Sequence, residues 1–275
     1  MIICKPMLRG GATLRIDRLV NHDIHDVLVL GSSRAHHHYD TPYLSDSLGI
    51  DVYNAGYDGF GVIMADGLLE LVLERYQPKL VIFDITYAFD LYKYPQDNQD
   101  RRYVSLLKPY YRHKPINRLI YDISKEEWYK VHSGLIRYNS DLVVLLLDYL
   151  NNRGNQNLGF APKSGVLSDY SEQEDDEILV IDPLKIKYME NLIWLAQSNN
   201  VPIVFIKSPR YGVTDSEIIK PARDICQRFN IPYFDYRTDP EFQRSDYFYD
   251  PHHLNSIGAR AFTKRVAKDV LLECL

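Results

Sequence analysis

The sequence has few cysteines, no long apolar run and no large excess of either charge. Its three cysteines, Cys4, Cys226 and Cys274, are too widely spaced to predict a metal site or a disulfide framework. No apolar run is long enough to cross a bilayer, and residues 1–18 lack the apolar core of a secretory signal. A net charge of −5 does not favour a polyanionic partner. The sequence therefore predicts no membrane span and no nucleic-acid partner.

The rest of the composition is that of a globular protein, with 45% hydrophobic and 25% charged residues. A length of 275 residues is ample for one core, and we expect a single domain over residues 1–275. The 22 tyrosines are unusual; such rings face sugars and flat ligands, but they also occupy half-buried core positions. A signal or anchor preceding Met1 would place the protein in the periplasm or cell envelope, and a chain without one would be cytoplasmic.

Five short apolar runs predict the strands of one sheet. They lie at residues 27–30, 50–54, 80–85, 202–207 and 231–235. Helical patterns lie between or after them, over residues 63–76, from residue 183 onward, and over residues 256–272. The first run has no polar face, which is typical of a parallel strand that is covered on both sides. We therefore predict an α/β fold with three layers around a five-stranded, parallel, doubly wound (flavodoxin-like) sheet.

The alternation of strands and helices breaks between about residues 91 and 180, which we interpret as an insertion into the same domain. The residues Ser124-Lys125-Glu126-Glu127 form a capping-box pattern, which predicts a helix as far as Leu135. A second helix is predicted over residues 141–150, and a long loop over residues 151–177. We expect the insertion to be a cap over the edge of the sheet where the functional residues lie.

The turn Gly31-Ser32-Ser33 directly follows the first predicted strand. Open α/β sheets place their functional groups at the carboxyl ends of the strands, and a glycine allows the backbone to bend there. Ser33 is therefore a candidate nucleophile. Glycine and serine are also ordinary turn residues, and the turn alone favours that simpler interpretation.

Asp250 and His253 lie three residues apart, just before the last predicted helix. A nucleophilic serine needs a base, and the base needs an anion that orients it. At this spacing the carboxylate of Asp250 can reach one ring nitrogen of His253 and leave the other free to face Ser33. His252 does not have this spacing. Without Ser33, the stretch would be interpreted as a surface loop.

Three blocks in this order resemble the SGNH (GDSL-type) hydrolase superfamily. They are Gly31-Ser32-Ser33, the pair Asn54 and Gly59, and the pair Asp250 and His253. The resemblance covers the sheet core but not the insertion. The wider segments GSSRAHHHYD and DPHHLNSIGA are similar to an envelope-associated, Bacteroidetes-type subgroup of that superfamily.

The resemblance implies a serine hydrolase acting on ester bonds. Ser33 would attack the carbonyl carbon, His253 would take and return the proton, and Asp250 would orient His253. The backbone amides of Ser33 and Gly59 would bind the oxyanion. Because an aromatic-rich cap suits a sugar, the expected reaction is hydrolysis of a short-chain, acetyl-type ester on a carbohydrate.

Two positions depart from the pattern of this superfamily. The aspartate of its first block is replaced by Ser32, and its third block, normally Gly-x-Asn-Asp, reads Asp84-Ile85-Thr86-Tyr87. The missing asparagine would donate to the oxyanion, and losing one such donor lowers rates roughly a hundredfold to a thousandfold. A hydroxyl of Thr86 or Tyr87 could replace it. Two alternatives therefore stay open: an envelope polysaccharide O-acyltransferase, and a non-catalytic module that binds a glycan or a protein partner.

Several other residues are candidates for the substrate pocket. Arg34 and Arg210 follow the first and fourth strands and could bind an anionic or carbonyl group, or could form structural ion pairs. Tyr57 and Asp58 could form the rim of the pocket or simply a tight turn. The run His36-His37-His38 does not predict a metal site, since consecutive histidines cannot all face one ion and no acid lies at ligand spacing beside them. We expect no metal and no cofactor.

Overall fold

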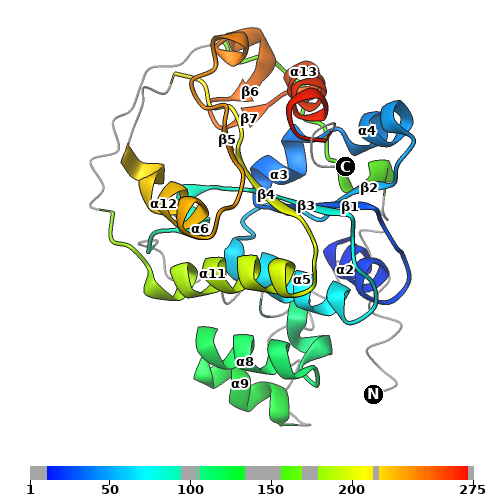
Figure 1. Ribbon diagram of the computed structural model, residues 1–275, viewed down its shortest axis with the longest axis vertical. Coiled ribbons are helices and arrows are strands. Elements are labelled where there is room, and N and C mark those ends of the chain that lie inside the picture. The colour runs from blue at the N-terminus through cyan, green and yellow to red at the C-terminus, as the bar shows by residue number, and fades with distance from the viewer. Residues whose placement is uncertain are drawn as a thin grey trace.

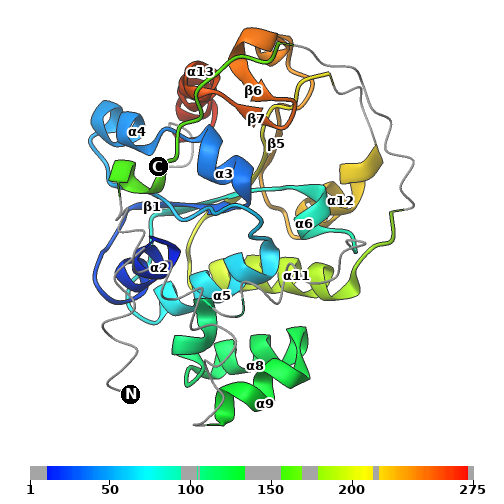
Figure 2. The same cartoon turned by 180° about the vertical axis from the view of Figure 1, so that it is seen from behind.

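The computed structural model describes residues 11–93, 104, 106–133, 156–168, 179–212 and 217–271. A five-stranded sheet lies between two layers of helices (Figures 1 and 2). The strand order is β2-β1-β3-β4-β5, and every neighbouring pair is parallel. The strands are β1 (Val27–Gly31), β2 (Val52–Asn54), β3 (Leu80–Asp84), β4 (Ile203–Lys207) and β5 (Tyr233–Asp235). The predicted α/β fold and sheet are confirmed, although β2 and β5 are each two residues shorter than predicted.

The strands β1, β3 and β4 are buried along their whole length, because helices cover both faces of the sheet. Successive side chains of a strand point to opposite faces. Leu28 and Leu30 of β1 therefore belong to one apolar core, and Val27 and Val29 belong to the other. This explains why the first strand shows no polar face in the sequence.

One helical layer packs on the core that contains Leu28. It comprises α2 (Gly11–Asn21), α5 (Val62–Leu73), α11 (Pro183–Ser198) and α12 (Lys220–Arg228), and the short α6 (Tyr87–Asp90) contacts α11 and α5. The other layer comprises α3 (Ser33–His38), α4 (Thr41–Leu48), α13 (Ser256–Val266) and the π-helical turn η6 (Ala267–Leu271). Ser33 therefore begins a helix of the second layer. None of the helices that the structure describes has the length and apolar character needed to cross a membrane.

Side chains that cap helix starts explain where several helices begin. Asp182 accepts a hydrogen bond from the amide of Leu184 at 2.9 Å and starts α11. Asn255 accepts from the amides of Ile257 and Gly258, each at 3.0 Å, and starts α13. The helix α13 passes into η6 and is followed as far as Leu271, close to the predicted end. The helix α5 ends at Leu73, three residues before its predicted end.

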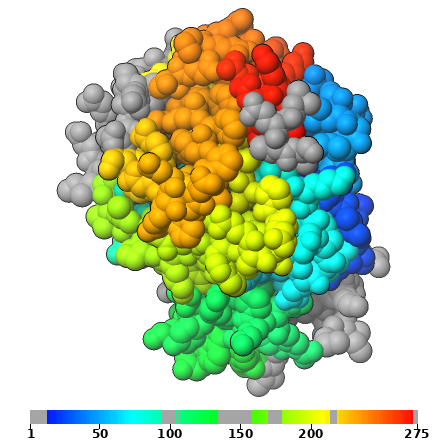
Figure 3. Space-filling model, viewed as in Figure 1, coloured from blue at the N-terminus to red at the C-terminus, as the bar shows by residue number. Residues whose placement is uncertain are grey.

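The helical part of the insertion does not lie where we expected it. It contains η1 (Lys108–Tyr110), α8 (Lys114–Ile123) and α9 (Lys125–His132), and Ser124 caps α9 by accepting from the amide of Glu127 at 3.3 Å. The helix α8 packs on α5, with Ile116 and Leu119 against Gly67, so close that a Cβ there would lie 2.9 Å from Leu119. These helices form the end of the molecule beyond α5 and α11, on the opposite side of the sheet from α3 (Figures 1 and 3).

The expectation of a helical cap over the functional edge is therefore wrong for α8 and α9, because α8 packs on α5 and α9 packs on α8. Another part of the insertion does approach the second layer. Residues 156–168, which begin with η2 (Gln156–Gly159), run beside α3 and α13. The amide of Ala161 donates to the carbonyl of His36 at 3.0 Å, and the amide of Ser256 donates to the carbonyl of Lys163 at 2.9 Å. Leu135 and residues 141–150, predicted as helix, lie outside the described residues, as does part of the predicted loop.

Candidate active site

Ser33 is the first residue of α3 and lies directly beyond the carboxyl end of β1. Gly31 has a φ of +139°, and a Cβ at this position would lie 2.7 Å from the carbonyl oxygen of Asp84 on β3. Only glycine therefore allows the chain to turn here while β3 passes so close. Ser33 is half-buried, so its hydroxyl lies at the edge of the sheet without being sealed inside it.

A small hairpin presents Asp250 and His253 to this edge. The strands β6 (Phe248–Asp250) and β7 (His253–Leu254) are antiparallel, and Asp250 pairs with His253. Three short 3-10 helices lie between β4 and this hairpin in the chain: η3 (Glu217–Ile219), η4 (Pro240–Phe242) and η5 (Ser245–Tyr247). The three-residue spacing seen in the sequence is thus spanned by a tight hairpin. The hairpin itself was not predicted, since each of its strands is only two or three residues long.

Ser33, His253 and Asp250 form one row of hydrogen bonds, which we call the catalytic row. The Oγ atom of Ser33 lies 2.8 Å from Nε2 of His253. On the other side of the ring, Nδ1 lies 2.8 and 2.9 Å from the two carboxylate oxygens of Asp250. The carboxylate can only accept, so the ring hydrogen is on Nδ1, and the lone pair of Nε2 faces the serine hydroxyl. This is the arrangement in which imidazole can remove a proton from serine.

Asp250 is held as an anion by its surroundings. Partial burial opposes ionisation, but the imidazole of His253 and the backbone amides of His252 and His253 donate to the carboxylate. Together these contacts lower the pKa of Asp250 to about 2. The residue that orients His253 is therefore negatively charged at neutral pH.

His38, the last residue of α3, binds the backbone of the hairpin. It is fully buried, and its Nε2 accepts a hydrogen bond from the backbone amide of Leu254 at 3.0 Å. Burial lowers the pKa of His38 well below its usual value, which keeps the ring neutral and able to accept. The run of three histidines gave no sign of this role, because the contact joins residues 216 positions apart.

The other two histidines of the run form a cluster with Asp58. Nδ1 of His36 and Nε2 of His37 each lie 2.9 Å from Oδ1 of Asp58. The interpretation that no acid accompanies these histidines is therefore wrong: Asp58 is 22 residues from His36 in the sequence, but the loop after β2 brings it back to them.

The hydrogen bonds of this cluster do not fit a metal ion. Nε2 of His36 lies 3.0 Å from Nη1 of Arg15, which can only donate, so the ring hydrogen of His36 is on Nδ1. A protonated nitrogen has no lone pair for a metal. Burial lowers the pKa of His36 to about 4, so the ring is neutral at pH 7 and carries this one hydrogen. Only His37 and Asp58 then remain, and two ligands are too few for a structural or catalytic zinc site.

The block after β2 holds the turn beside Ser33 together. The side chain of Asn54 is buried; it donates to the carbonyl of Ala35 at 2.6 Å and accepts from the amide of Gly56 at 3.0 Å. Gly56, which the sequence did not single out, allows α3 to approach, since a Cβ there would lie 2.5 Å from the Cβ of Ala35. Gly59 has a φ of +79°, which favours glycine. Its role as an oxyanion donor stays a prediction.

The two positions that depart from the superfamily pattern contact one another. The hydroxyls of Ser32 and Thr86 lie 2.7 Å apart, and both side chains are buried. Either hydroxyl can be the donor in this pair, so the role of Thr86 as a replacement donor to the oxyanion stays a prediction. Asp90 binds the backbone at Thr86. Its carboxyl group accepts hydrogen bonds from the amide of Thr86 at 2.5 Å and from the amide of Val62 at 2.7 Å.

The remaining pocket candidates lie around the catalytic row. Tyr57 stacks on the ring of His36 at 5.5 Å between ring centroids, and Tyr87 lies beneath the ammonium group of Lys207 at 6.0 Å. The side chain of Asp58 is 57% exposed and has the contacts described above. Arg34 and Arg210 lie near the row and make no ion pair with any described residue.

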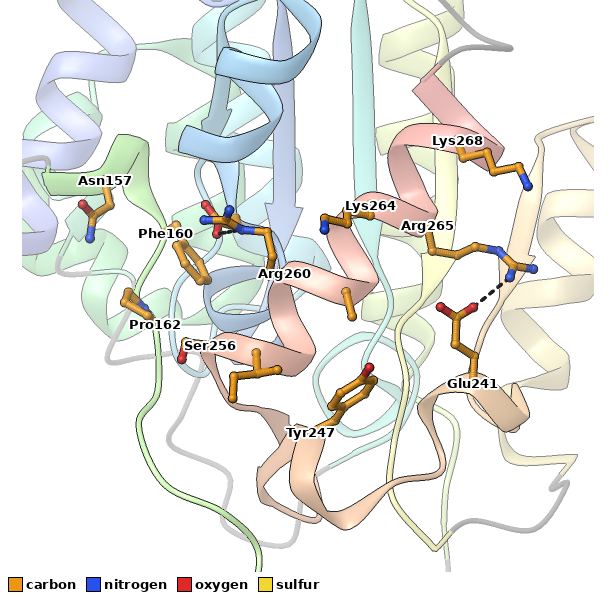
Figure 4. A pocket seen from close by; sticks show the side chains of 13 residues that line it. Asn157, Phe160, Pro162, Glu241, Tyr247, Ser256, Arg260, Lys264, Arg265 and Lys268 are labelled. Carbon is orange, nitrogen blue, oxygen red and sulfur yellow. Dashed lines mark hydrogen bonds and ion pairs between the residues drawn. The ribbon is translucent and has the colours of Figure 1, made fainter.

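A separate cavity lies on the outer side of α13, with a volume of about 940 Å³. Phe160 and Pro162 line one side of it, and Arg260, Lys264 and Lys268 line the other (Figure 4). Arg260 is paired with Asp40 at 2.6 Å, and Arg265 with Glu241 at 3.0 Å. The three residues of the catalytic row do not line this cavity, so we do not assign the site to it.

No protein-family model matches this sequence, and a search of curated proteins finds no match. Among solved structures, the chain is similar to a Bacteroides fragilis protein described as a candidate acylhydrolase, with 12% identity, coverage of 96% and 98% of the two chains, and a TM-score of 0.47. It is also similar to the Pseudoalteromonas sp. esterase EstA, with 11% identity, coverage of 90% and 97%, and a TM-score of 0.47. AlinE4, described as an SGNH-hydrolase family esterase, matches at 10% identity, 91% and 97% coverage, and a TM-score of 0.34.

Proposed function

We propose that this protein is a serine esterase that hydrolyses a short-chain, acetyl-type ester, with a carbohydrate as the expected carrier of the ester. The observation that carries the proposal is the catalytic row, in which Ser33, His253 and Asp250 are joined by hydrogen bonds of 2.8–2.9 Å. Such a row converts a weakly nucleophilic hydroxyl into an attacking group.

The reaction follows from the positions of the hydrogens. As Oγ of Ser33 attacks the carbonyl carbon, its proton passes to Nε2 of His253, and Asp250 stabilises the resulting imidazolium. The amides of Ser33 and Gly59 are the proposed donors to the oxyanion. His253 then gives the proton to the departing alcohol, which leaves an acyl group on Ser33. Water, deprotonated by His253, releases the acid and restores the serine.

Two features bear on rate and on the rival functions. The asparagine donor of the third block is absent, so we expect a slower enzyme than one with a complete oxyanion site. A polysaccharide O-acyltransferase would use the same acyl-enzyme, with a sugar hydroxyl in place of water. A purely glycan- or partner-binding module would have no need of a base aligned on a serine hydroxyl, so the row supports an enzyme over a module.

The test is hydrolysis of p-nitrophenyl acetate by the wild-type protein and by Ser33→Ala. We expect the substitution to lower kcat by about a thousandfold or more, because it removes the nucleophile. Ser47→Ala, which removes an exposed serine of α4, is the matched control and should keep the wild-type rate. Equal rates in wild type and Ser33→Ala would contradict the proposal. Product formation that requires an added glycan would favour the transferase.

A further inference from the structure

Arg34 is a buried arginine that has no partner among the residues the structure describes. It follows the candidate nucleophile directly, and only 2% of its surface is exposed. Its Nη1 atom is buried without a hydrogen bond, and its guanidinium forms no hydrogen bond or ion pair with any residue that the structure describes. Arginine stays charged in proteins, and a buried charge without a partner is strongly unfavourable.

Two other buried cations in this region have carbonyl acceptors for their hydrogen bonds. Lys207 donates to the carbonyl of Ile85 at 2.6 Å, and Lys185 donates to the carbonyl of Tyr92 at 2.7 Å. Asp84 is the acid that acts most strongly on Arg34, but its two oxygens accept from the hydroxyls of Tyr39 at 2.6 Å and Ser208 at 3.2 Å. Arg34 therefore differs from these lysines, because no acceptor among the described residues lies within bonding distance of its guanidinium group.

Arg210 is a second such cation in the same region. It lies three residues beyond β4, is half-buried, and has a buried Nε atom without a hydrogen bond. The charges of Arg34 and Arg210 act on each other and on His252, the neighbour of His253 in the hairpin. Loss of solvent around its ring and these two positive charges lower the pKa of His252. The two guanidinium groups thus concentrate positive charge beside the catalytic row.

We propose that Arg34 and Arg210 form an anion subsite beside Ser33, so that the substrate is an ester with a carboxylate or phosphate group close to the scissile carbonyl. The inference rests on the proposed esterase function and names its substrate class. The planar guanidinium group suits both anions, because it presents parallel N–H donors to paired oxygens. An acetylated sugar acid would combine this anion with the expected carbohydrate.

The kinetic test compares two acetyl esters that differ in charge. We expect the wild-type protein to hydrolyse para-acetoxybenzoate with a kcat/KM about tenfold or more above that for para-acetoxybenzamide. In Arg210→Gln this ratio should fall towards one. Arg244→Gln, which removes an exposed arginine that pairs with Asp246 and lies over the ring of Tyr247, should keep the wild-type ratio. A wild-type ratio of one both with this pair and with the succinate pair described next, or an equal ratio in all three proteins, would overturn the proposal.

A second pair of esters tells on which side of the carbonyl the anion lies. Monomethyl succinate carries the carboxylate on the acyl side, and its monoamide is the neutral counterpart. A charge preference with this pair alone would place the subsite beside the acyl group; a preference with the benzoate pair alone would place it beside the alcohol. Inhibition of either reaction by inorganic phosphate, weakened in Arg210→Gln, supports the subsite and shows that it accepts phosphate.

A binding measurement separates this inference from the esterase proposal. Ser33→Ala cannot turn over an ester through Ser33, so calorimetry with para-acetoxybenzoate and para-acetoxybenzamide reports binding alone. Preferential binding of the benzoate, lost in Ser33→Ala/Arg210→Gln, would support the subsite even if no ester were hydrolysed. No difference between the charged and the neutral compound, either with this pair or with monomethyl succinate and its monoamide, would overturn it even if the wild-type protein proved to be an esterase.

Discussion

Two neighbouring regions at the edge of the sheet differ in whether their buried polar atoms have hydrogen-bond partners. In the catalytic row, Oγ of Ser33, both ring nitrogens of His253 and both oxygens of Asp250 have partners within 2.9 Å. Beside it, one buried nitrogen each of Arg34 and Arg210 has no hydrogen-bond partner within the described part of the chain. The row is complete without substrate, as a preorganised proton-transfer site should be. In the proposed subsite, an anionic group of the substrate would be the partner of the two arginines.

Arg237 shows that this fold can satisfy a buried arginine. Its side chain is 6% exposed, and its Nε and Nη2 atoms lie 2.8–3.1 Å from the carboxylate of Asp235. Arg34 is even more buried and has no such contact. Because both residues belong to one chain, the difference between them reflects their local surroundings. Arg237 binds the carboxylate at the end of β5, whereas Arg34 is the arginine for which we propose an anionic ligand.

The largest expected effect follows from breaking the row at Asp250. In Asp250→Asn the amide group would donate to Nδ1 of His253, which moves the ring hydrogen to Nε2 and removes the acceptor for the serine proton. We expect kcat for p-nitrophenyl acetate to fall about ten-thousandfold. Asp246→Asn, an exposed position before the same hairpin, should keep the wild-type rate. A loss below about tenfold would show that the row is not the proton-transfer path.

A second prediction concerns Asp90, one of the acids whose charge acts on Arg34. Burial raises the pKa of Asp90 to about 7, despite donation from the amides of Thr86 and Val62. Its folded-state pKa lies above the usual value near 4, so the unfolded chain releases this proton first as pH rises. The stabilisation from the protonated form is therefore fully present below about pH 4 and is lost as pH rises to about 7.

In Asp90→Asn this pH dependence should be absent. The free energy of unfolding of the wild type minus that of the variant should fall by about 1 kcal/mol per pH unit between pH 4 and 7. It should stay level above pH 7. Urea unfolding across this range measures it. The result also bears on Arg34, because a protonated Asp90 carries no charge that could offset the charge of Arg34. A difference that is constant with pH would show that Asp90 is ionised throughout.

The sequence predicted those features that depend on short segments. The run at β1 lacks a polar face because both faces of the sheet are covered, and the spacing of Asp250 and His253 is set within one hairpin. The pairing of Ser32 with Thr86 and the contact of His38 with Leu254 could not be predicted, because they join residues 54 and 216 positions apart. Such contacts depend on how loops from separate strands pack together.

The position of α8 and α9 shows a further limit. The capping box at Ser124 correctly predicted where α9 begins, since capping is a local property. Which surface these helices cover depends on Gly67 of α5, whose missing side chain makes room for Leu119. The sequence also marked Arg34 as an even choice between an ion pair and a substrate contact. Only the positions of the acids around it decide between them.

The smallest and most direct test replaces each buried arginine with methionine, which has a similar length and no charge. Arg237→Met removes the guanidinium group that pairs with Asp235, so we expect the free energy of unfolding to fall by about 1–2 kcal/mol. Arg34→Met removes a buried charge that has no bonded partner, so we expect a change of less than about 1 kcal/mol or a gain in stability. Urea unfolding at pH 7 compares the two variants with the wild type. If Arg34→Met lost as much stability as Arg237→Met, Arg34 would be a structural residue like Arg237, and the distinction between the two regions would fail.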